Sequence, residues 1–221
     1  MIDVDFYTDI DFKFNSHWEV TIQPYNNSYI LFIDNIYKNP LKLFDYLQRV
    51  PIVSHKPHSK NSLNGQTFID GQHTLHPDLY CNDKHRRLLM AKICDFYNLD
   101  LSKIIPQIHI NQFRLLKDYP GQKLNWICHT DFQLNVLIFL NPQENMTAGT
   151  SFYKAKQKDS LKQLNHEHEQ PWINDYLFEE QLCILSKFNS LVAFPGQWPH
   201  GQKIIDNRYK EKTRFTEVTF L

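Results

Sequence analysis

The second half of the chain, from about residue 107, is a succession of short β-rich segments separated by turn residues. Many short strands that follow helices predict an antiparallel sandwich or jelly roll with the helices packed outside. The expected strands are 108–116, 124–131, 133–141, 150–155, 183–186, 190–194, 201–205 and 213–221. A chain of 221 residues is long enough for one domain with a sizeable core. We therefore expect a single domain over 1–221, with a jelly-roll core at 107–221.

Residues 1–106 are expected to form helical and loop support for this core. A strand is expected at 29–34, and one helix is expected to begin at Asn39-Pro40, with Leu41, Phe44, Leu47 and Val50 along its apolar stripe. A second helix should follow Asn82-Asp83, with Leu89, Ile93 and Phe96 on one side. Two polar stretches interrupt the pattern: a long loop at 51–80 and an insertion at about 142–181, whose part from 155 should be partly helical. Both are candidate lids or specificity elements.

The charge balance provides no global field that would attract nucleic acid or anionic membranes, so nucleic acid is an unsupported partner, though not an excluded one. Lys and Arg number 24 and Asp and Glu number 24. No stretch approaches the roughly 18 apolar residues of a membrane span, and the acidic start of the chain lacks the features of a signal peptide. The four cysteines form no CxxC pair, which favours free thiols in a reducing compartment. We therefore expect a cytoplasmic protein, and the sequence carries no signal of its oligomeric state.

The motif His129-Thr130-Asp131 is the first candidate for chemistry. Residues two apart in a strand point to the same face, so His129 and Asp131 are expected to project together from the end of the segment 124–131. His200 follows the apolar segment 190–194 and a Pro/Gly turn, where it can reach the same cavity. Two imidazoles and one carboxylate are the protein ligands of a non-haem iron site, and they leave positions open for a cosubstrate and O2.

Arg214 lies on the last expected strand and is the fourth candidate. Alternation places it on one face with Thr216, Val218 and Phe220. A buried guanidinium needs an anionic partner. A dicarboxylate ligand such as 2-oxoglutarate could supply it, and a salt bridge to a protein carboxylate is the alternative. Arg208 is a rival for the same role, but 204–212 reads as a polar hairpin with Arg208 at its exposed tip.

The segments YPGQKLNWICHTD, LIFLN, AGTSFY, FPGQWPHG and TRFTEVTFL resemble the Fe(II)/2-oxoglutarate dioxygenases, in particular their prolyl-4-hydroxylase-like branch. The similarity covers roughly residues 107–221, and a weaker similarity to the same proteins is found in the segment YILFIDNIYKNPLKLFDYL. The resemblance implies a double-stranded β-helix. It also implies that His129, Asp131 and His200 bind iron and that Arg214 binds the C5 carboxylate of 2-oxoglutarate. Further cosubstrate contacts are expected from Tyr119, Asn111 and Thr216.

This resemblance implies an oxygenase that uses Fe(II), 2-oxoglutarate and O2, and releases succinate and CO2. Relatives that halogenate have a small residue at the position of Asp131, so this carboxylate favours hydroxylation or a desaturation variant of it. The expected substrate is a small amino-acid-like metabolite or a peptidyl side chain. Two alternatives stay open: a cupin-like metal enzyme that does not use 2-oxoglutarate, and a non-catalytic jelly-roll binding module. Arg214 distinguishes the first alternative, because such an enzyme needs no buried carboxylate anchor.

Overall fold

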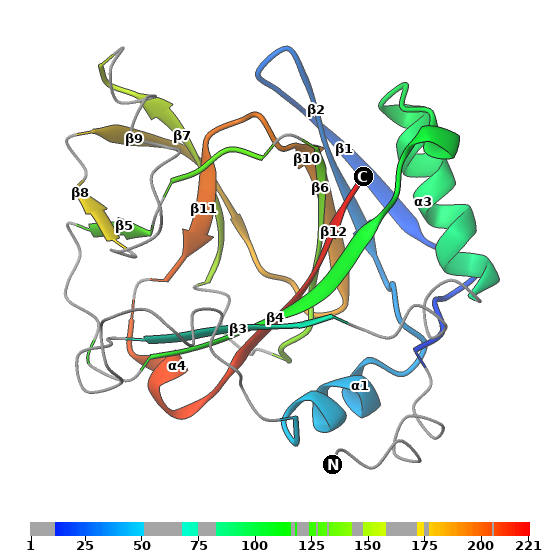
Figure 1. Cartoon of the computed structure of the whole chain (residues 1–221), viewed down its shortest axis with the longest axis horizontal. Coiled ribbons are helices and arrows are strands. Elements are labelled where there is room, and N and C mark those ends of the chain that lie inside the picture. The colour runs from blue at the N-terminus through cyan, green and yellow to red at the C-terminus, as the bar shows by residue number, and fades with distance from the viewer. Residues whose placement is uncertain are drawn as a thin grey trace.

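The structure is a computed structural model that describes residues 12–50, 68–74, 83–115, 118, 124–126, 128–131, 133–142, 148–157, 172–174, 177–204 and 206–221. Strands dominate it, and three helices and a short 3-10 turn accompany them (Figure 1). In chain order the elements are β1 (Glu19–Tyr25), β2 (Ser28–Asp34), α1 (Pro40–Leu47), β3 (Phe68–Thr74), α3 (Lys84–Phe96), η2 (Leu101–Lys103), β4 (Gln107–Leu115), β5 (Leu124–Trp126), β6 (Leu134–Phe139), β7 (Gly149–Ala155), β8 (Trp172–Asn174), β9 (Phe178–Leu185), β10 (Ser190–Pro195), β11 (His200–Lys203), α4 (Arg208–Glu211) and β12 (Arg214–Phe220).

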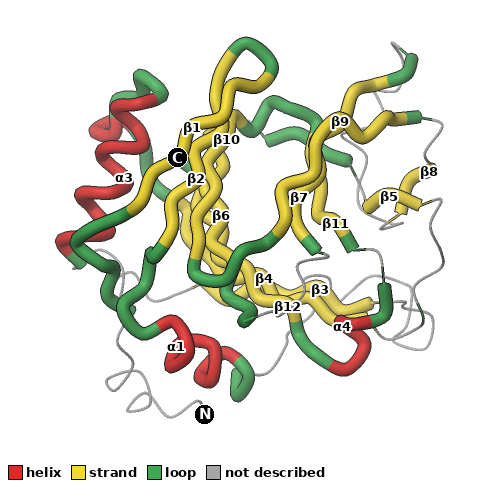
Figure 2. The backbone as a smooth tube through the Cα atoms, turned by 180° about the vertical axis from the view of Figure 1, so that it is seen from behind, coloured by secondary structure: helices red, strands yellow, loops and turns green. Residues whose placement is uncertain are grey.

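Two antiparallel sheets form the centre of the fold. The larger sheet has the order β1-β2-β10-β6-β12-β4-β3, and the smaller has the order β11-β7-β9. From β6 onward the chain passes back and forth between them: β7 and β9 lie in the small sheet, β10 in the large one, β11 in the small one and β12 in the large one. The small sheet lies on one side of the large sheet, and α1 and α3 lie on the other (Figures 1 and 2). This winding confirms the predicted jelly roll with helices packed outside.

Successive side chains of the central strands point to opposite faces of the large sheet, so apolar side chains form a separate core on each face. The outer core, between this sheet and the helices, is the larger one and includes Ile138, Phe215, Leu43 and Leu89. The inner core, between the two sheets, is built mainly from large rings and includes Phe139, Phe152, Phe194 and Trp198. Both faces of β12 are therefore buried, although the sequence suggested one inward face.

Both predicted helices are present, with one change in the buried face. α1 buries Leu43, Tyr46 and Leu47, whereas Leu41 is 59% exposed, so the predicted stripe is shifted around the helix. Pro40 occupies the first turn as expected, but Asn39 makes no side-chain capping bond. In α3, Asp83 does cap the helix by accepting from the backbone N–H of His85 at 2.8 Å. Leu89 and Ile93 are buried there, and Phe96 lies at the rim, 37% exposed.

Several segments predicted as loops contain strands or a helix. Residues 68–74, inside the predicted loop 51–80, form β3 and pair residue by residue with β4. The predicted insertion 142–181 includes β7, β8 and the start of β9, and its described residues contain no helix. The predicted hairpin at 204–212 contains the short helix α4 instead. The rest of both predicted lids, 51–67, 75–80, 143–147, 158–171 and 175–176, lies outside the described residues.

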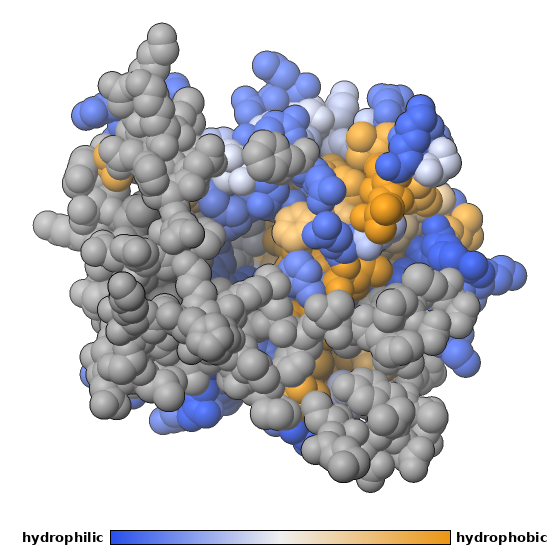
Figure 3. Space-filling model, in the orientation of Figure 1, coloured by the Kyte–Doolittle hydropathy of each residue, from blue (hydrophilic) through white to orange (hydrophobic). Residues whose placement is uncertain are grey.

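The space-filling view shows how apolar residues are distributed on one face of the molecule (Figure 3). Apolar residues gather in a patch where β12 ends and β4 begins, and hydrophilic residues frame it (Figure 3). No helix in the described part of the chain combines the length and the apolar character needed to cross a membrane.

Cys94, Cys128 and Cys183 are free thiols, as predicted, and Cys81 lies outside the described residues.

Candidate metal centre

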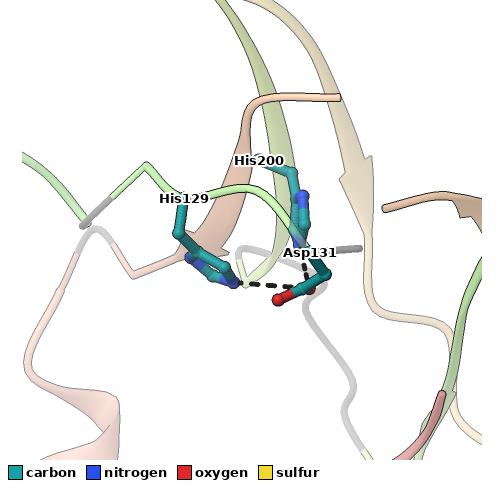
Figure 4. Close-up of side chains that lie close together, drawn as sticks. All are labelled: His129, Asp131 and His200. Atoms are coloured by element: carbon teal, nitrogen blue, oxygen red, sulfur yellow. Dashed lines mark ion pairs between the residues drawn. The ribbon is translucent and has the colours of Figure 1, made fainter. Parts of the chain in front are cut away.

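His129, Asp131 and His200 converge at one point. One ligand atom of each residue lies within 4.8 Å of those of the other two. The Asp131 carboxylate oxygen Oδ2 is 3.3 Å from His200 Nε2 and 3.9 Å from His129 Nε2. The three side chains point toward one another from two separate segments (Figure 4). The sequence prediction of this cluster is therefore correct in its geometry.

Backbone hydrogen bonds hold these two segments together. β5 ends at Trp126, three residues earlier than the motif, and His129 instead forms an isolated antiparallel bridge with His200. The two residues exchange backbone bonds: His129 N donates to His200 O at 2.8 Å, and His200 N donates to His129 O at 2.9 Å. Asp131 N donates to the carbonyl of Gly196 at 2.8 Å. Main-chain pairing therefore brings the two segments of the site together.

His200 is oriented by its neighbours. Its ring is buried, 4% exposed, and packs edge-on against Phe194 at a centroid distance of 4.9 Å. Its Nδ1 lies 2.7 Å from the backbone carbonyl of Trp198. Because a carbonyl can only accept, Nδ1 carries a hydrogen, and in the neutral ring Nε2 therefore presents its lone pair. This is the tautomer that a metal ligand needs.

The Asp131 carboxyl is held in its ionised form. Burial raises its pKa, but the interactions of the carboxyl with His200, His129 and Asn135 outweigh this effect and lower it. The resulting pKa is about 2. The carboxylate therefore carries a negative charge at neutral pH and is available to a cation.

Arg214 reaches across the interior from the large sheet to the small one. It lies at the start of β12 and is 6% exposed. Its guanidinium donates to the side-chain oxygen of Gln202 on β11 and, at 3.2 Å, to the carbonyl of Gly149 at the start of β7. Its rival Arg208 lies on α4 and pairs with Asp206 at 2.9 Å. Arg214 therefore points into the interior, as predicted, whereas Arg208 forms an ion pair with a neighbouring carboxylate.

Thr216 and Asn111 lie near Arg214 on the same face of the large sheet. The two residues are direct partners in the pairing of β12 with β4, where Arg214 pairs with Phe113. The Thr216 hydroxyl and the Asn111 Oδ1 are buried and have no hydrogen-bond partner in the described structure. Buried polar atoms are rarely left without a partner, so a ligand at this place would satisfy both side chains. Tyr119, the remaining predicted contact, lies outside the described residues.

Two polar residues of this interior were missed by sequence reasoning. Asn135, on β6, contacts Asp131 and His200, and Gln202 accepts from Arg214. A signal was available for Gln202, because it follows His200 by two residues on β11 and therefore shares its face. Asn135 carried no such signal, since its position depends on how β6 pairs with β10 and β12.

No protein-family model matches the sequence, and no curated protein matches it significantly. Solved structures do match. EvdO2 from Micromonospora carbonacea var. aurantiaca, in complex with 2-oxoglutarate, is 8% identical, and the match covers 91% of this chain and 92% of EvdO2 with a TM-score of 0.50. HygX from Streptomyces hygroscopicus, with nickel and 2-oxoglutarate bound, is 10% identical over 86% of this chain and 82% of HygX, with a TM-score of 0.47.

A prolyl hydroxylase from Trichoplax adhaerens, in complex with a hypoxia inducible factor peptide fragment, also matches. It is 14% identical over 86% of this chain and 82% of its own, with a TM-score of 0.44. The EvdO2 match spans nearly all of both chains, and at this identity it shows a shared fold. The chain therefore has the double-stranded β-helix fold that its resemblance to the 2-oxoglutarate-dependent oxygenases predicted.

Proposed function

We propose that this protein is an Fe(II)- and 2-oxoglutarate-dependent oxygenase that hydroxylates an unactivated C–H bond of a small amino-acid-like metabolite or of a peptidyl side chain. The observation that carries the proposal is the cluster of His129, Asp131 and His200, whose ligand atoms lie within 4.8 Å of one another. Two imidazole nitrogens and one carboxylate oxygen are the ligand set of non-haem iron oxygenases. EvdO2, which has the same fold, binds 2-oxoglutarate in its crystal.

The donor set fits an iron ion. In its neutral form His200 presents the lone pair of Nε2, and Asp131 is ionised, so both side chains offer an atom that can bind a metal. All three ligands come from the paired segments around 129–131 and 200, which leaves the remaining positions of the metal open to small molecules. The apolar rings of Phe194 and Phe152 lie beside His200, at 4.9 and 6.4 Å between ring centroids, so the inner side of His200 is apolar.

The same interior offers a place for the cosubstrate. Arg214 would bind the C5 carboxylate of 2-oxoglutarate with its planar fork, which suits two carboxylate oxygens. The Thr216 hydroxyl would donate to the same carboxylate, and the Asn111 amide, turned about its last side-chain bond, would present its NH2 there. Tyr119 stays a predicted contact.

Bound Fe(II), with 2-oxoglutarate and O2, supplies the oxidising chemistry that yields succinate, CO2 and a hydroxylated product. The protein contributes binding, orientation and a water-poor cavity. Asp131 would supply the carboxylate ligand that halogenating relatives replace with a small residue, and its presence supports hydroxylation over halogenation.

An anaerobic titration with 2-oxoglutarate tests the proposal. Fe(II)-loaded protein should develop the visible charge-transfer band of the metal chelate as 2-oxoglutarate is added. In Arg214→Ala, half-saturation should require at least about tenfold more 2-oxoglutarate, because a charged hydrogen-bonding partner is lost. Arg208→Ala is the matched control: it removes a guanidinium that pairs with Asp206, and its titration should equal that of the wild type.

The titration also separates the alternatives. If iron binds and no band forms, the protein is a metal-dependent enzyme of another kind, such as a cupin-like one. If iron does not bind to the wild type, the metal centre itself is refuted and a binding module becomes the better reading. If Arg208→Ala weakens the band and Arg214→Ala does not, the assignment of the anchor is wrong.

A further inference from the structure

Asn135 lies directly beside the ligand atoms of the candidate metal centre. It is on β6 and is 2% exposed. Its Nδ2 donates to Asp131 Oδ2 at 2.6 Å and lies 3.0 Å from His200 Nε2. These two atoms are the ones through which Asp131 and His200 approach each other, at 3.3 Å. One amide group therefore touches two of the three ligands.

The direction of both hydrogen bonds follows from chemistry. The Asp131 carboxylate can only accept. In the neutral His200 ring, which is the form that binds a metal, Nδ1 carries the hydrogen toward the carbonyl of Trp198 and Nε2 carries a lone pair. Asn135 must then donate in both contacts, one hydrogen of its NH2 group to each ligand atom. Among uncharged side chains of this size, only an amide offers two hydrogens on one nitrogen.

The carbonyl end of the same amide is unsatisfied. Asn135 Oδ1 is buried and has no hydrogen-bond partner in the described part of the structure. The backbone of Asn135 has little freedom to move and give Oδ1 a partner, since β6 is paired on both sides. At this position its neighbours are Phe194 of β10 and Phe220 of β12. The two candidate metal ligands therefore explain the orientation of the amide, because no other described group of the site forms a hydrogen bond with it.

We propose that Asn135 is a positioning residue of the metal site. Its amide holds the Asp131 carboxylate and the His200 imidazole in the ligating arrangement before a metal arrives. A bound metal would take the lone pair of His200 Nε2, and Asn135 would keep its bond to the Asp131 carboxylate. This inference deepens the proposed function and rests on its metal site, but it does not depend on 2-oxoglutarate or on the substrate.

Co(II) binding tests the role without requiring any activity. Co(II) titrated into Asn135→Leu, a nearly isosteric change that removes both donors, should bind about 10–100-fold more weakly than to the wild type, as found when outer-sphere partners of metal ligands are removed. The ligand-field absorption of the bound Co(II) should also change, because the carboxylate is no longer held in one orientation. A residue that only supports the fold would leave that spectrum unaltered.

Asn141→Leu is the matched control. Asn141 is a buried asparagine just after β6 that bonds the backbone, donating to Thr213 O at 2.8 Å and accepting from Phe215 N at 2.6 Å. Its loss should lower the melting temperature and leave both the Co(II) affinity and the spectrum unchanged. Asn135→Ser, which is too short to bridge the two ligands, should repeat the loss of affinity if Asn135→Leu fails to fold.

The outcomes separate this inference from the proposed function. Wild-type affinity and an unchanged spectrum in Asn135→Leu overturn the positioning role while the metal centre stands. A wild-type protein that binds no Co(II) overturns the metal centre as well. An equal loss in Asn135→Leu and Asn141→Leu also refutes the inference, because it assigns the effect to general destabilisation.

Discussion

Gly196 shows how a single residue without a side chain shapes the candidate centre. Its carbonyl accepts from Asp131 N at 2.8 Å, and its N–H donates to Gln133 O at 2.9 Å. A Cβ at this position would lie 2.2 Å from Gln133 O and 2.9 Å from Asp131 Cβ, both of which belong to the segment that carries the motif. Space for any other residue can come only from moving that segment.

We therefore expect Gly196→Ala to shift Asp131 away from His200. The variant should lose about 1–3 kcal/mol in free energy of unfolding, the usual cost of overpacking, and should bind Co(II) more weakly than the wild type. Urea denaturation gives the first quantity, and Co(II) titration of the folded variant gives the second. Unchanged values for both would show that the turn accommodates a methyl group and that the close approach is unimportant.

At this scale the sequence predicted the cluster of His129, Asp131 and His200 better than the residues around it. His129, Asp131 and His200 could be found because a spacing of two in extended chain, plus a distant histidine after an apolar strand, is a recognisable arrangement. Asn135 could not be found in this way, because its contacts depend on the register of β6 between β10 and β12. The contacts of Arg214 with Gln202 and Gly149 likewise require the two sheets to face each other.

The strand β12 joins the interior to the helices through its alternating side chains. Arg214 and Thr216 face the small sheet, whereas Glu217 faces the helices, where Arg86 of α3 pairs with it at 2.5 Å. Both of these side chains are at most 3% exposed. Tyr37 donates its hydroxyl to Glu217 as well, and burial raises the pKa of this phenol well above its ordinary value, so the donor stays protonated. Removing the guanidinium leaves a carboxylate buried without its counter-charge.

Arg86→Met should accordingly cost about 3–5 kcal/mol in free energy of unfolding, the usual penalty for breaking a buried ion pair on one side. Lys187→Met is the comparison, because Lys187 pairs with Asp34 at the surface and its side chain is 59% exposed. That change should cost no more than about 1 kcal/mol. Chemical denaturation of both variants gives the two values, and similar losses would mean that the buried pair contributes nothing beyond a surface pair.

Elements with a strong local pattern could be predicted, and elements that depend on a neighbour could not. The helices α1 and α3 and the central strands β6, β10 and β12 carry apolar periodicity of their own. β3 contains Asp70 and Gly71, which are poor strand formers, and it forms a strand because β4 offers a paired edge along its whole length. α4 is a single turn between two strands, too short for any periodic signal.

At the scale of the whole molecule, a bound metal should stabilise the fold, because it would link residues that lie far apart in the sequence. Two of its candidate ligands, Asp131 and His200, lie 69 positions apart in the sequence, and they meet only when β6, β10 and β11 have taken their places. An ion that binds the folded protein and not the unfolded chain raises stability by about 2.7 kcal/mol at a free concentration 100 times its dissociation constant. For a chain of this size, that corresponds to a rise of about 5–10 °C in melting temperature.

Thermal melting of metal-free protein with and without Co(II) measures this coupling. The chain has 11 histidines, so a rise in the wild type could in principle come from other sites. His200→Ala resolves the question, because it removes the most buried ligand and leaves the other 10 histidines in place. The rise should disappear in this variant. A rise of equal size in His200→Ala would assign the stabilising ion to another part of the molecule and would separate the stability of the fold from the candidate centre.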